Sequence, residues 1–349
     1  MGEGLVKKHV LAFILVIVLG VMAACSNENA SKGENSGEAK AGEKFDLRLA
    51  TVVSAPHPWL DAAEYFKEEV EKRTDGNVTI SIHHSGSLGD DETTIDEMRL
   101  GTIDFVIGGT QNAASFVPRL QIFGLAYLFE DMDHFERAID ENSLLFEYFE
   151  QEFVDKNLDV KLLALSGGGT RYLSNNKKEI KNPDDLKGLK LRLPGSPIEN
   201  DIWSALGALP SSLSWNEVYS GIQTGVVEGF ESTLSGYTGS KLYEVAPYVS
   251  LTEHLYMATH FTMSDLTFNK LPEEYQEIVD EVAKEAAKLG TEKGIEFDEE
   301  LFKELEEREV TITEVERDKF VEILDPLHDD LAAQLAAEEL VEIVRELKE

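Results

Sequence analysis

The chain has 349 residues, with 67 acidic side chains against 32 basic ones and a formal net charge of −35 at pH 7. This acidity argues against nucleic acid as a partner, because nucleic-acid binding depends on basic patches that neutralise phosphates. It also disfavours a protein that lies flat on an anionic lipid surface. In so acidic a chain, a cationic residue inside a strand pattern is conspicuous.

The first 24 residues have the pattern of a secretory signal peptide. Lys7 and Lys8 precede an apolar run over residues 10–24, which ends in small residues just before Cys25. The run is shorter than the ~20 residues that a membrane-spanning helix needs. Cys25 is the only cysteine, so an internal disulfide is excluded. We therefore expect an exported protein.

Residues 25–44 are predicted to be a flexible tether. After Cys25 they read SNENASKGENSGEAKAGEK and contain no large apolar side chain. A segment of this composition cannot bury a core. Folded sequence is therefore expected from about Phe45 onward, for about 300 residues, which is enough for two domains.

Strands and helices alternate in the first half of this folded part. Apolar periodicity predicts strands over residues 45–53, 78–83, 102–107 and 160–165, with helices following the first two. His57 lies in the loop after the first strand. Trp59 shares a helical stripe with Ala63 and Phe66, which favours a place in the core.

The alternation restarts after the glycines at 167–169, with strands predicted over residues 171–174, 189–193, 226–231 and 256–264. Beyond Pro272 the chain is charged and predicted to be helical to its end. This order indicates an α/β fold, which we expect to form a two-lobed clamp. Each lobe would be a mixed sheet flanked by helices, with long C-terminal helices. Lobe 1 would take residues 45–168 and about 258–300, and lobe 2 residues 169–257 and about 301–349.

Arg192 occupies a notable place in the second half. It lies near the end of a predicted strand, and Ser196-Pro197-Ile198-Glu199 then open a helix as a capping box with proline at the first helical position. Ligands of open α/β sheets bind in the crevice outside such strand ends. Arg171 follows the glycine run and can face the same crevice.

Two arginines in an acidic chain suggest a site for an organic acid, because a guanidinium presents a planar fork that matches a carboxylate. The alternative is that each arginine forms a structural ion pair with a nearby Glu or Asp. An enzyme is disfavoured, since the nucleophile elbow, the phosphate-binding loop, the dinucleotide fingerprint and HExxH are all missing. No metal or cofactor is expected.

Two stretches resemble a known family. Residues 185–232, DLKGLKLRLPGSPIENDIWSALGALPSSLSWNEVYSGIQTGVVEGFES, resemble the central motif of the substrate-binding proteins of TRAP transporters, the DctP-type family. Residues 87–105, SLGDDETTIDEMRLGTIDF, are similar to a second family motif. The resemblance runs from about residue 46 to beyond 300. It implies a periplasmic-binding-protein-like clamp that captures small organic acids and passes them to two membrane permease subunits, without enzymatic activity.

The resemblance also implies site residues. Arg192 matches the arginine that holds the ligand carboxylate, Arg171 matches a second pocket arginine, and Trp215 matches an aromatic residue beside the ligand's carbon skeleton. Ser232 replaces the usual asparagine and leaves room for a larger ligand or a water molecule. The remaining predicted contacts are Asp91, Gly109, Thr110, Gln111 and, at the crevice mouth, His57; Gly109 stands where one subgroup has an acidic residue.

The end of the signal peptide resembles a lipobox. Cys25 would then be lipidated, and acyl chains would hold the mature protein on the outer face of the cytoplasmic membrane. A sensor that signals to a membrane receptor is the alternative function, because the same ligand-bound state would serve either partner. Which organic acid is bound stays open between a dicarboxylate, a sugar acid and a keto acid.

Overall fold

The computed structural model describes residues 42–348. The predicted signal peptide, Cys25 and most of the predicted tether lie outside these residues. Within the described part, nine strands form one sheet. They are β1 (Phe45–Ala50), β2 (Val78–His83), β3 (Phe105–Gly109), β4 (Val160–Asn175), β5 (Lys190–Leu193), β6 (Leu209–Ser212), β7 (Gly229–Thr233), β8 (Tyr248–Ser264) and β9 (Thr311–Glu314).

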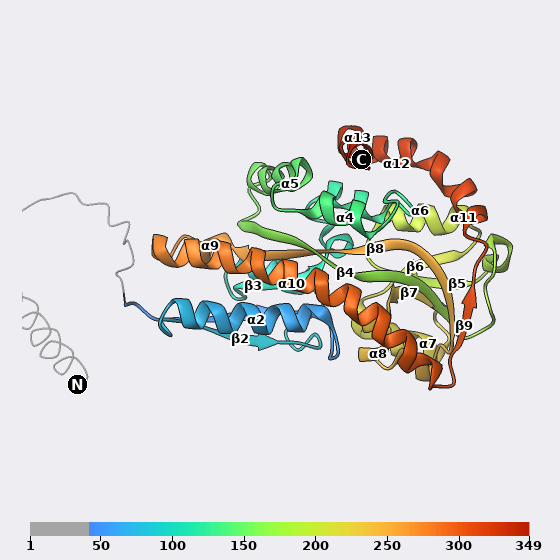
Figure 1. The fold of residues 1–349 in the computed structure, drawn as a ribbon, viewed down its shortest axis with the longest axis horizontal. Coiled ribbons are helices and arrows are strands. Elements are labelled where there is room, and N and C mark those ends of the chain that lie inside the picture. Colours follow the sequence, from blue (N-terminus) through green and yellow to red (C-terminus); the bar gives the residue numbers. More distant parts are fainter. Residues whose placement is uncertain (1–41, 349) are drawn as a thin grey trace, which may run out of the picture. The chain divides into compact units, whose positions relative to one another are not determined.

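Helices flank this sheet along the described chain (Figure 1). They are α2 (Pro58–Arg73), α3 (Asp91–Arg99), α4 (Met132–Ile139), α5 (Leu144–Asp155), α6 (Pro197–Ala205), α7 (Val218–Thr224), α8 (Leu234–Gly239), α9 (Asp265–Phe268), α10 (Glu273–Glu306), α11 (Arg317–Leu324), α12 (His328–Leu335) and α13 (Glu338–Glu346). The expected mixed α/β fold with long C-terminal helices is confirmed.

The sheet consists of two parallel groups joined by a central antiparallel pair. The strand order is β2-β1-β3-β8-β4-β7-β5-β6, with β9 beside β8. The strands β2, β1 and β3 run parallel to one another, as do β7, β5 and β6. Between them lie β4 and β8, which pair with each other antiparallel along most of their length. Both long strands therefore run from one half of the sheet into the other.

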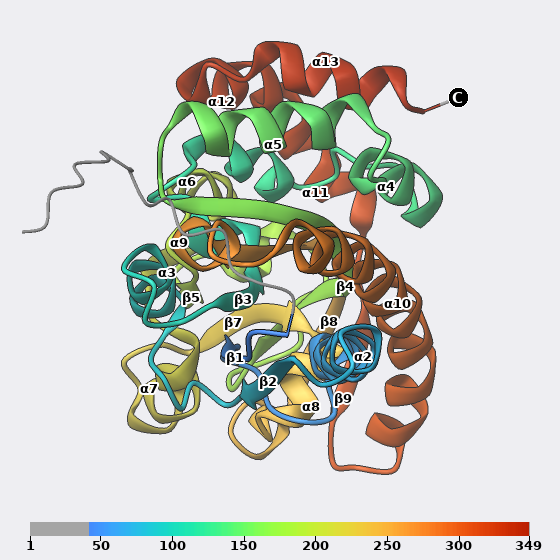
Figure 2. The ribbon, with the colours of Figure 1, turned by 90° about the vertical axis from the view of Figure 1, so that its left-hand side faces the viewer.

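Separate apolar cores cover the sheet. Phe66 of α2 packs edge-on against Phe105 of β3 and Phe261 of β8, with ring centroids 5.1 and 4.7 Å apart. All three rings are buried, and such edge-to-face pairs add to the stabilisation from area burial alone. A second core lies under α4, α5, α6 and α11–α13; Figure 2 shows α5, α12 and α13 stacked on the side of the sheet away from α2 and α8. The third joins β7, α7 and α8 to the end of α10.

The structure corrects two of the predictions made for helices and strands. The strands predicted over 160–165 and 171–174 are parts of the single strand β4, because the glycines 167–169 are absorbed by a register shift against β8. The predicted helical end of the chain is interrupted by β9, which extends the sheet beside β8. A short 3₁₀ turn, Trp215–Glu217, precedes α7.

The boundaries between the two lobes stay a prediction. Gly167 of β4 pairs with Ala258 of β8, so the two predicted crossover points face each other in the sheet. The helices α12 and α13, which the prediction places in lobe 2, contact segments that it places in lobe 1. His328 Nε2 lies 2.8 Å from the Ala126 carbonyl oxygen, and His134 Nε2 lies 2.7 Å from that of Val344.

The long helix α10 crosses β4 at a point where no side chain fits. A Cβ atom added at Gly294 would lie 2.7 Å from the Gly169 nitrogen and 2.9 Å from the Gly168 carbonyl carbon. Both neighbours are backbone atoms, so they cannot move aside without shifting the strand. The approach of α10 to β4 therefore depends on glycine here.

We expect Gly294→Ala to lower the free energy of unfolding by about 1–3 kcal/mol, the usual cost of overpacking. Gly290→Ala is the matched control, because the same change one turn earlier meets only ordinary contacts, the nearest being Ala62 Cβ at 3.4 Å. Alanine is the better helix former by about 1 kcal/mol, so the control should be neutral or stabilising. Urea denaturation of both variants checks this; equal effects would contradict the packing argument.

Candidate ligand-binding site

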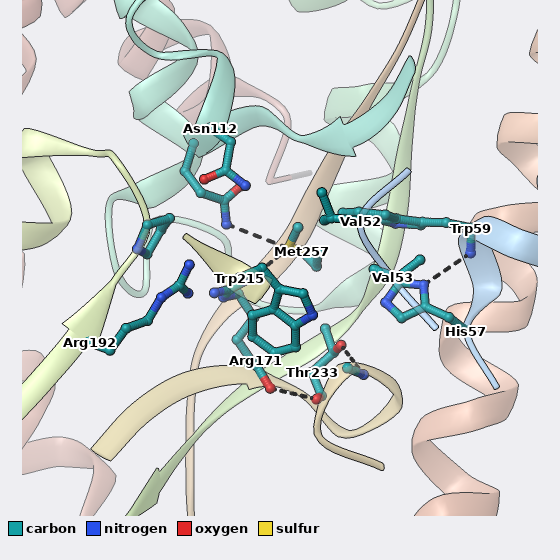
Figure 3. A pocket seen from close by; sticks show the side chains of 14 residues that line it. Val52, Val53, His57, Trp59, Asn112, Arg171, Arg192, Trp215, Thr233 and Met257 are labelled. Carbon is teal, nitrogen blue, oxygen red and sulfur yellow. Dashed lines mark hydrogen bonds between the residues drawn. The ribbon is translucent and has the colours of Figure 1, made fainter. Parts of the chain in front are cut away.

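A cavity lies where the two halves of the sheet meet, with about 450 Å³ of empty space that includes its solvent-open mouth. Segments before α2 and after β3 line one side, and β4, β5, β7 and the turn before α7 line the other (Figure 3). Of the predicted site residues, six line this cavity: His57, Gln111, Arg171, Arg192, Trp215 and Ser232. Val52, Trp59, Asn112, Thr233 and Met257 also line it and were not predicted to do so.

Arg192 is buried, with 2% of its surface exposed, and points from β5 toward the cavity (Figure 3). Its Nε donates to the Leu213 carbonyl oxygen at 2.7 Å. No other described residue accepts a hydrogen bond or forms an ion pair with this guanidinium. The Trp215 ring lies below it, with Cζ 5.5 Å from the ring centroid. Burial lowers the pKa of Arg192 to about 10, so it is charged at neutral pH.

Arg171 differs, because a glutamate occupies its fork. Its Nε donates to Glu231 Oε2, and its Nη2 donates to Glu231 Oε1 at 2.5 Å. Nη1 is directed at the Met257 sulfur, 2.7 Å away. The alternative of a structural ion pair therefore holds for Arg171, although the residue also lines the cavity.

Glu231 is fully buried and is fixed from two sides. Its Oε2 also lies 3.3 Å from His254 Nε2, whose Nδ1 lies 2.9 Å from Thr252 Oγ1. Thr252 and His254 lie in a bulge of β8, between the residues that pair with Arg171 and Leu173 of β4. Burial acts to raise the pKa of Glu231, but Arg171 and His254 together hold it well below the usual range. Glu231 is therefore an anion.

The opposite wall of the cavity carries uncharged groups. His57 accepts from the Trp59 backbone nitrogen through Nδ1 at 3.2 Å and caps α2, and burial lowers its pKa to about 3. The prediction that Trp59 packs in the core is correct, yet the residue also lines the cavity, and its buried Nε1 has no acceptor among the described residues. Gln111 Oε1 likewise has no donor.

Three predicted residues do not line the cavity. Asp91 opens α3 and is buried, and its pKa is raised to about 7 by burial, against the lowering effect of Arg192. Gly109 lies in β3, where an added Cβ would meet Met257 and Gln111 at 2.7 and 2.8 Å. Thr110 donates from Oγ1 to the Ala258 carbonyl oxygen at 3.3 Å. Their contact with a ligand stays a prediction.

Glu199 is a site feature that the sequence led us to misassign. Ser196 caps α6 as expected, accepting from the Glu199 backbone nitrogen at 3.3 Å. The Glu199 carboxyl does not complete the capping box: it is 1% exposed and neither oxygen has a hydrogen-bond partner. Burial, with the charge of Glu231, raises its pKa to about 8. At neutral pH Glu199 is therefore a neutral acid beside the two arginines.

Two further features of the described residues bear on the class of protein. No described helix is both long and apolar enough to span a bilayer. No group of three or more His, Cys, Asp or Glu side chains in the described part could hold a metal ion. A cavity between two halves of a mixed sheet, carrying one open guanidinium and several neutral polar groups, is the arrangement of a solute-binding protein.

Comparison with known proteins identifies the family. Residues 49–335 match the bacterial extracellular solute-binding proteins, family 7 (DctP), and the chain belongs to this family. A solute-binding protein of Sulfitobacter sp. (strain NAS-14.1) is 36% identical over 310 residues, 88% of this chain and 93% of the relative. The family consists of TRAP periplasmic solute-binding proteins, which are not enzymes.

Solved structures give the same result. A TRAP periplasmic solute-binding protein from Sulfitobacter sp. NAS-14.1, with bound α-D-taluronate, superposes with a TM-score of 0.81 at 35% identity, covering 86% of this chain and 97% of that one. One from Roseobacter denitrificans OCh 114, with bound L-galactonate, has a TM-score of 0.79 at 29% identity, covering 88% and 99%. The chain is thus a TRAP-type solute-binding protein.

The buried Glu199 generates a pH prediction. Its pKa rises from an ordinary 4.5 to about 8 on folding. Between these values the unfolded chain releases the proton and the folded chain retains it, so this residue lowers stability as pH rises. Glu199→Gln cannot ionise. We expect its stability advantage over the wild type, measured by urea denaturation without ligand, to grow from pH 5 to pH 8. Glu322→Gln, at an exposed position of α11, is the control, and an advantage independent of pH would contradict the prediction.

Proposed function

We propose that this protein captures a small organic acid by its carboxylate on Arg192 and delivers it to a TRAP-type secondary transporter. The observation that carries the proposal is the buried guanidinium of Arg192, which has Leu213 as its one hydrogen-bond acceptor among the described residues and otherwise opens to the cavity. A carboxylate supplies two acceptor oxygens in the plane of the fork. The ligand then neutralises a charge that is costly to bury alone.

The other contacts of the proposed complex follow from the cavity walls. Trp215 offers a flat apolar surface below Arg192 for the carbon skeleton of the ligand. Ser232 has a short side chain. Its Oγ is turned aside and donates to the Thr233 carbonyl oxygen at 2.8 Å. The space that an asparagine would fill is therefore open to a ligand or a water molecule. On the far wall, Trp59 Nε1 and Gln111 Oε1 are placed to meet hydroxyl groups.

The class of ligand is supported by the relatives. The Sulfitobacter structure holds taluronate and the Roseobacter structure holds galactonate, and both ligands combine one carboxylate with several hydroxyls. Transport is favoured over the sensor alternative, because the family and these relatives are TRAP proteins. We infer that the ligand is a sugar acid or a related hydroxy acid.

The first test is a thermal-shift panel of organic acids, followed by isothermal titration calorimetry. The panel holds galacturonate, galactonate, pantoate and succinate. A tight ligand raises the apparent melting temperature by mass action. A panel in which no carboxylic acid changes the melting temperature would contradict the proposed function.

Arg192→Ala should weaken binding of the acid identified in that panel by about 3–5 kcal/mol, since it leaves a buried anion without its counter-charge. Arg192→Lys should also bind weakly, because an ammonium cannot reproduce the two parallel hydrogen bonds. Titration calorimetry measures both. Arg99→Ala, outside the cavity on α3, is the control and should bind like the wild type. An unchanged dissociation constant for Arg192→Ala would contradict the proposal that Arg192 binds the ligand carboxylate.

The proposal places the protein on the outer face of the cytoplasmic membrane, held by lipid on Cys25. The proposed partners are two membrane-bound permease subunits, and a lipid anchor would keep the receptor near them. Cys25→Ala should move the protein from the membrane fraction to the soluble extracellular or periplasmic fraction, as measured by fractionation and immunoblotting. Mass spectrometry of the purified wild type should find a diacylglyceryl group on Cys25. A wild-type protein that starts elsewhere and carries no lipid would contradict this part.

A further inference from the structure

Two segments from opposite ends of the sheet touch each other beside the cavity. Residues 51–57 follow β1, which pairs with β2 and β3. The helix α8 follows β7, which pairs with β4 and β5. Val53 and His57 of the first segment line the cavity (Figure 3), and so does Gly236 of α8. The two segments therefore form parts of opposite walls.

The closest approach of these walls is between backbone atoms at Gly239, the last residue of α8. A Cβ atom added there would lie 2.4 Å from the Ser54 carbonyl oxygen and 3.2 Å from that of Pro56. Both oxygens belong to the backbone, so they cannot turn aside as the end of a side chain could. Glycine is the residue that allows two backbones to approach in this way. The described arrangement therefore requires glycine at position 239.

No hydrogen bond joins residues 51–57 to α8 in the part of the chain that the structure describes. Each segment is instead held within its own end of the sheet. The Val53 carbonyl oxygen accepts from the Ser85 nitrogen at 2.8 Å, and Tyr237 Oη of α8 donates to the Ala246 carbonyl oxygen at 2.9 Å. The contact at Gly239 can therefore break without the loss of a hydrogen bond.

A second contact connects the loops that follow the two outermost strands. Gly86 lies after β2 and Asn216 after β6, and these strands are the two ends of the strand order. A Cβ atom added at Gly86 would lie 2.2 Å from Asn216 Nδ2. Here the neighbour is the end of a flexible side chain, which can move away. Of the two contacts, the one at Gly239 is the rigid one.

We propose that Gly239 is a positioning residue for ligand capture, whose backbone contact with residues 54–56 forms when the two ends of the sheet close on the ligand and breaks when they open. This inference rests on the proposed function, because a bound acid stabilises the closed arrangement. The strands β4 and β8 run through both ends of the sheet, so a change in their bend moves α8 relative to residues 54–56. A side chain at position 239 then raises the free energy of the closed arrangement alone.

Gly239→Ala tests this assignment, with galactonate and galacturonate as the acids. Without acid, we expect the urea midpoint of the variant to equal or exceed that of the wild type, because alanine is the better helix former and the open arrangement has no clash. With acid, calorimetry should give a dissociation constant at least about 10-fold higher, since a smaller fraction of the protein reaches the closed arrangement.

A kinetic measurement separates this role from a general disturbance of the site. Trp59 and Trp215 line the cavity, so stopped-flow tryptophan fluorescence can follow binding. We expect Gly239→Ala to speed dissociation of the acid and to leave the association rate within about twofold of the wild type, because the acid enters before closure. An effect confined to the association rate would contradict a role in closure.

Two further variants are the controls. Gly290→Ala, where the nearest contact is Ala62 Cβ at 3.4 Å, should bind acid like the wild type. Gly294→Ala, with its clash against β4, should lower the urea midpoint without acid. A Gly239→Ala variant with wild-type affinity would overturn the inference, as would one whose urea midpoint falls as far as that of Gly294→Ala, because the contact would then persist in the absence of acid.

The wild-type titration separates this inference from the proposed function. If the wild type binds no carboxylic acid, the proposed function fails and the role of Gly239 fails with it. If the wild type binds galactonate or galacturonate and Gly239→Ala binds it equally well, only the role of Gly239 is removed.

Discussion

A guanidinium that is buried without a partner raises the free energy of a protein unless something else supplies the counter-charge. Arg192 is in this position, since its protein hydrogen bond uses Nε and leaves the outer fork directed at the cavity. Nearby acids do not fill the role. Glu231 is engaged by Arg171, and the carboxyl of Glu199 is protonated at neutral pH. In the proposed mechanism the ligand carboxylate completes the site.

The central strands explain how such a ligand can act on the whole fold. The strands β4 and β8 continue from one half of the sheet to the other, and Arg171 and Met257 lie on them beside the cavity. A ligand bound between Arg192 and Trp59 touches both halves. If open and closed arrangements exist, an acid that binds the closed one better shifts the population toward it.

Local patterns in the sequence predicted a large share of this structure. The strand Val78–His83 has its predicted bounds, because strict alternation and a turn on its N-terminal side determine it locally. Arg192 was expected near a strand end and close to a crevice, and it is found there. The capping serine of α6 was also predicted correctly. These features depend on residues within one turn or one strand of each other.

Features that depend on distant pairing were not predicted. Arg171 and Glu231 lie 60 residues apart, and the register of β4 against β7 brings them together. The neutral state of Glu199 depends on burial by surrounding elements, so a capping-box pattern alone gave the wrong role for its side chain. Likewise, Trp59 belongs to a helical apolar stripe, and sequence spacing does not show that this residue also lines a cavity. No local signal in the sequence could have identified these three.

The most direct test of the central claim is a crystal structure of the protein with a bound sugar acid. We expect the ligand carboxylate to accept hydrogen bonds from the fork of Arg192 at about 2.7–2.9 Å, while Arg171 keeps its ion pair with Glu231. A complex in which the carboxylate lies away from Arg192, with that guanidinium turned onto a protein carboxylate, would contradict the account.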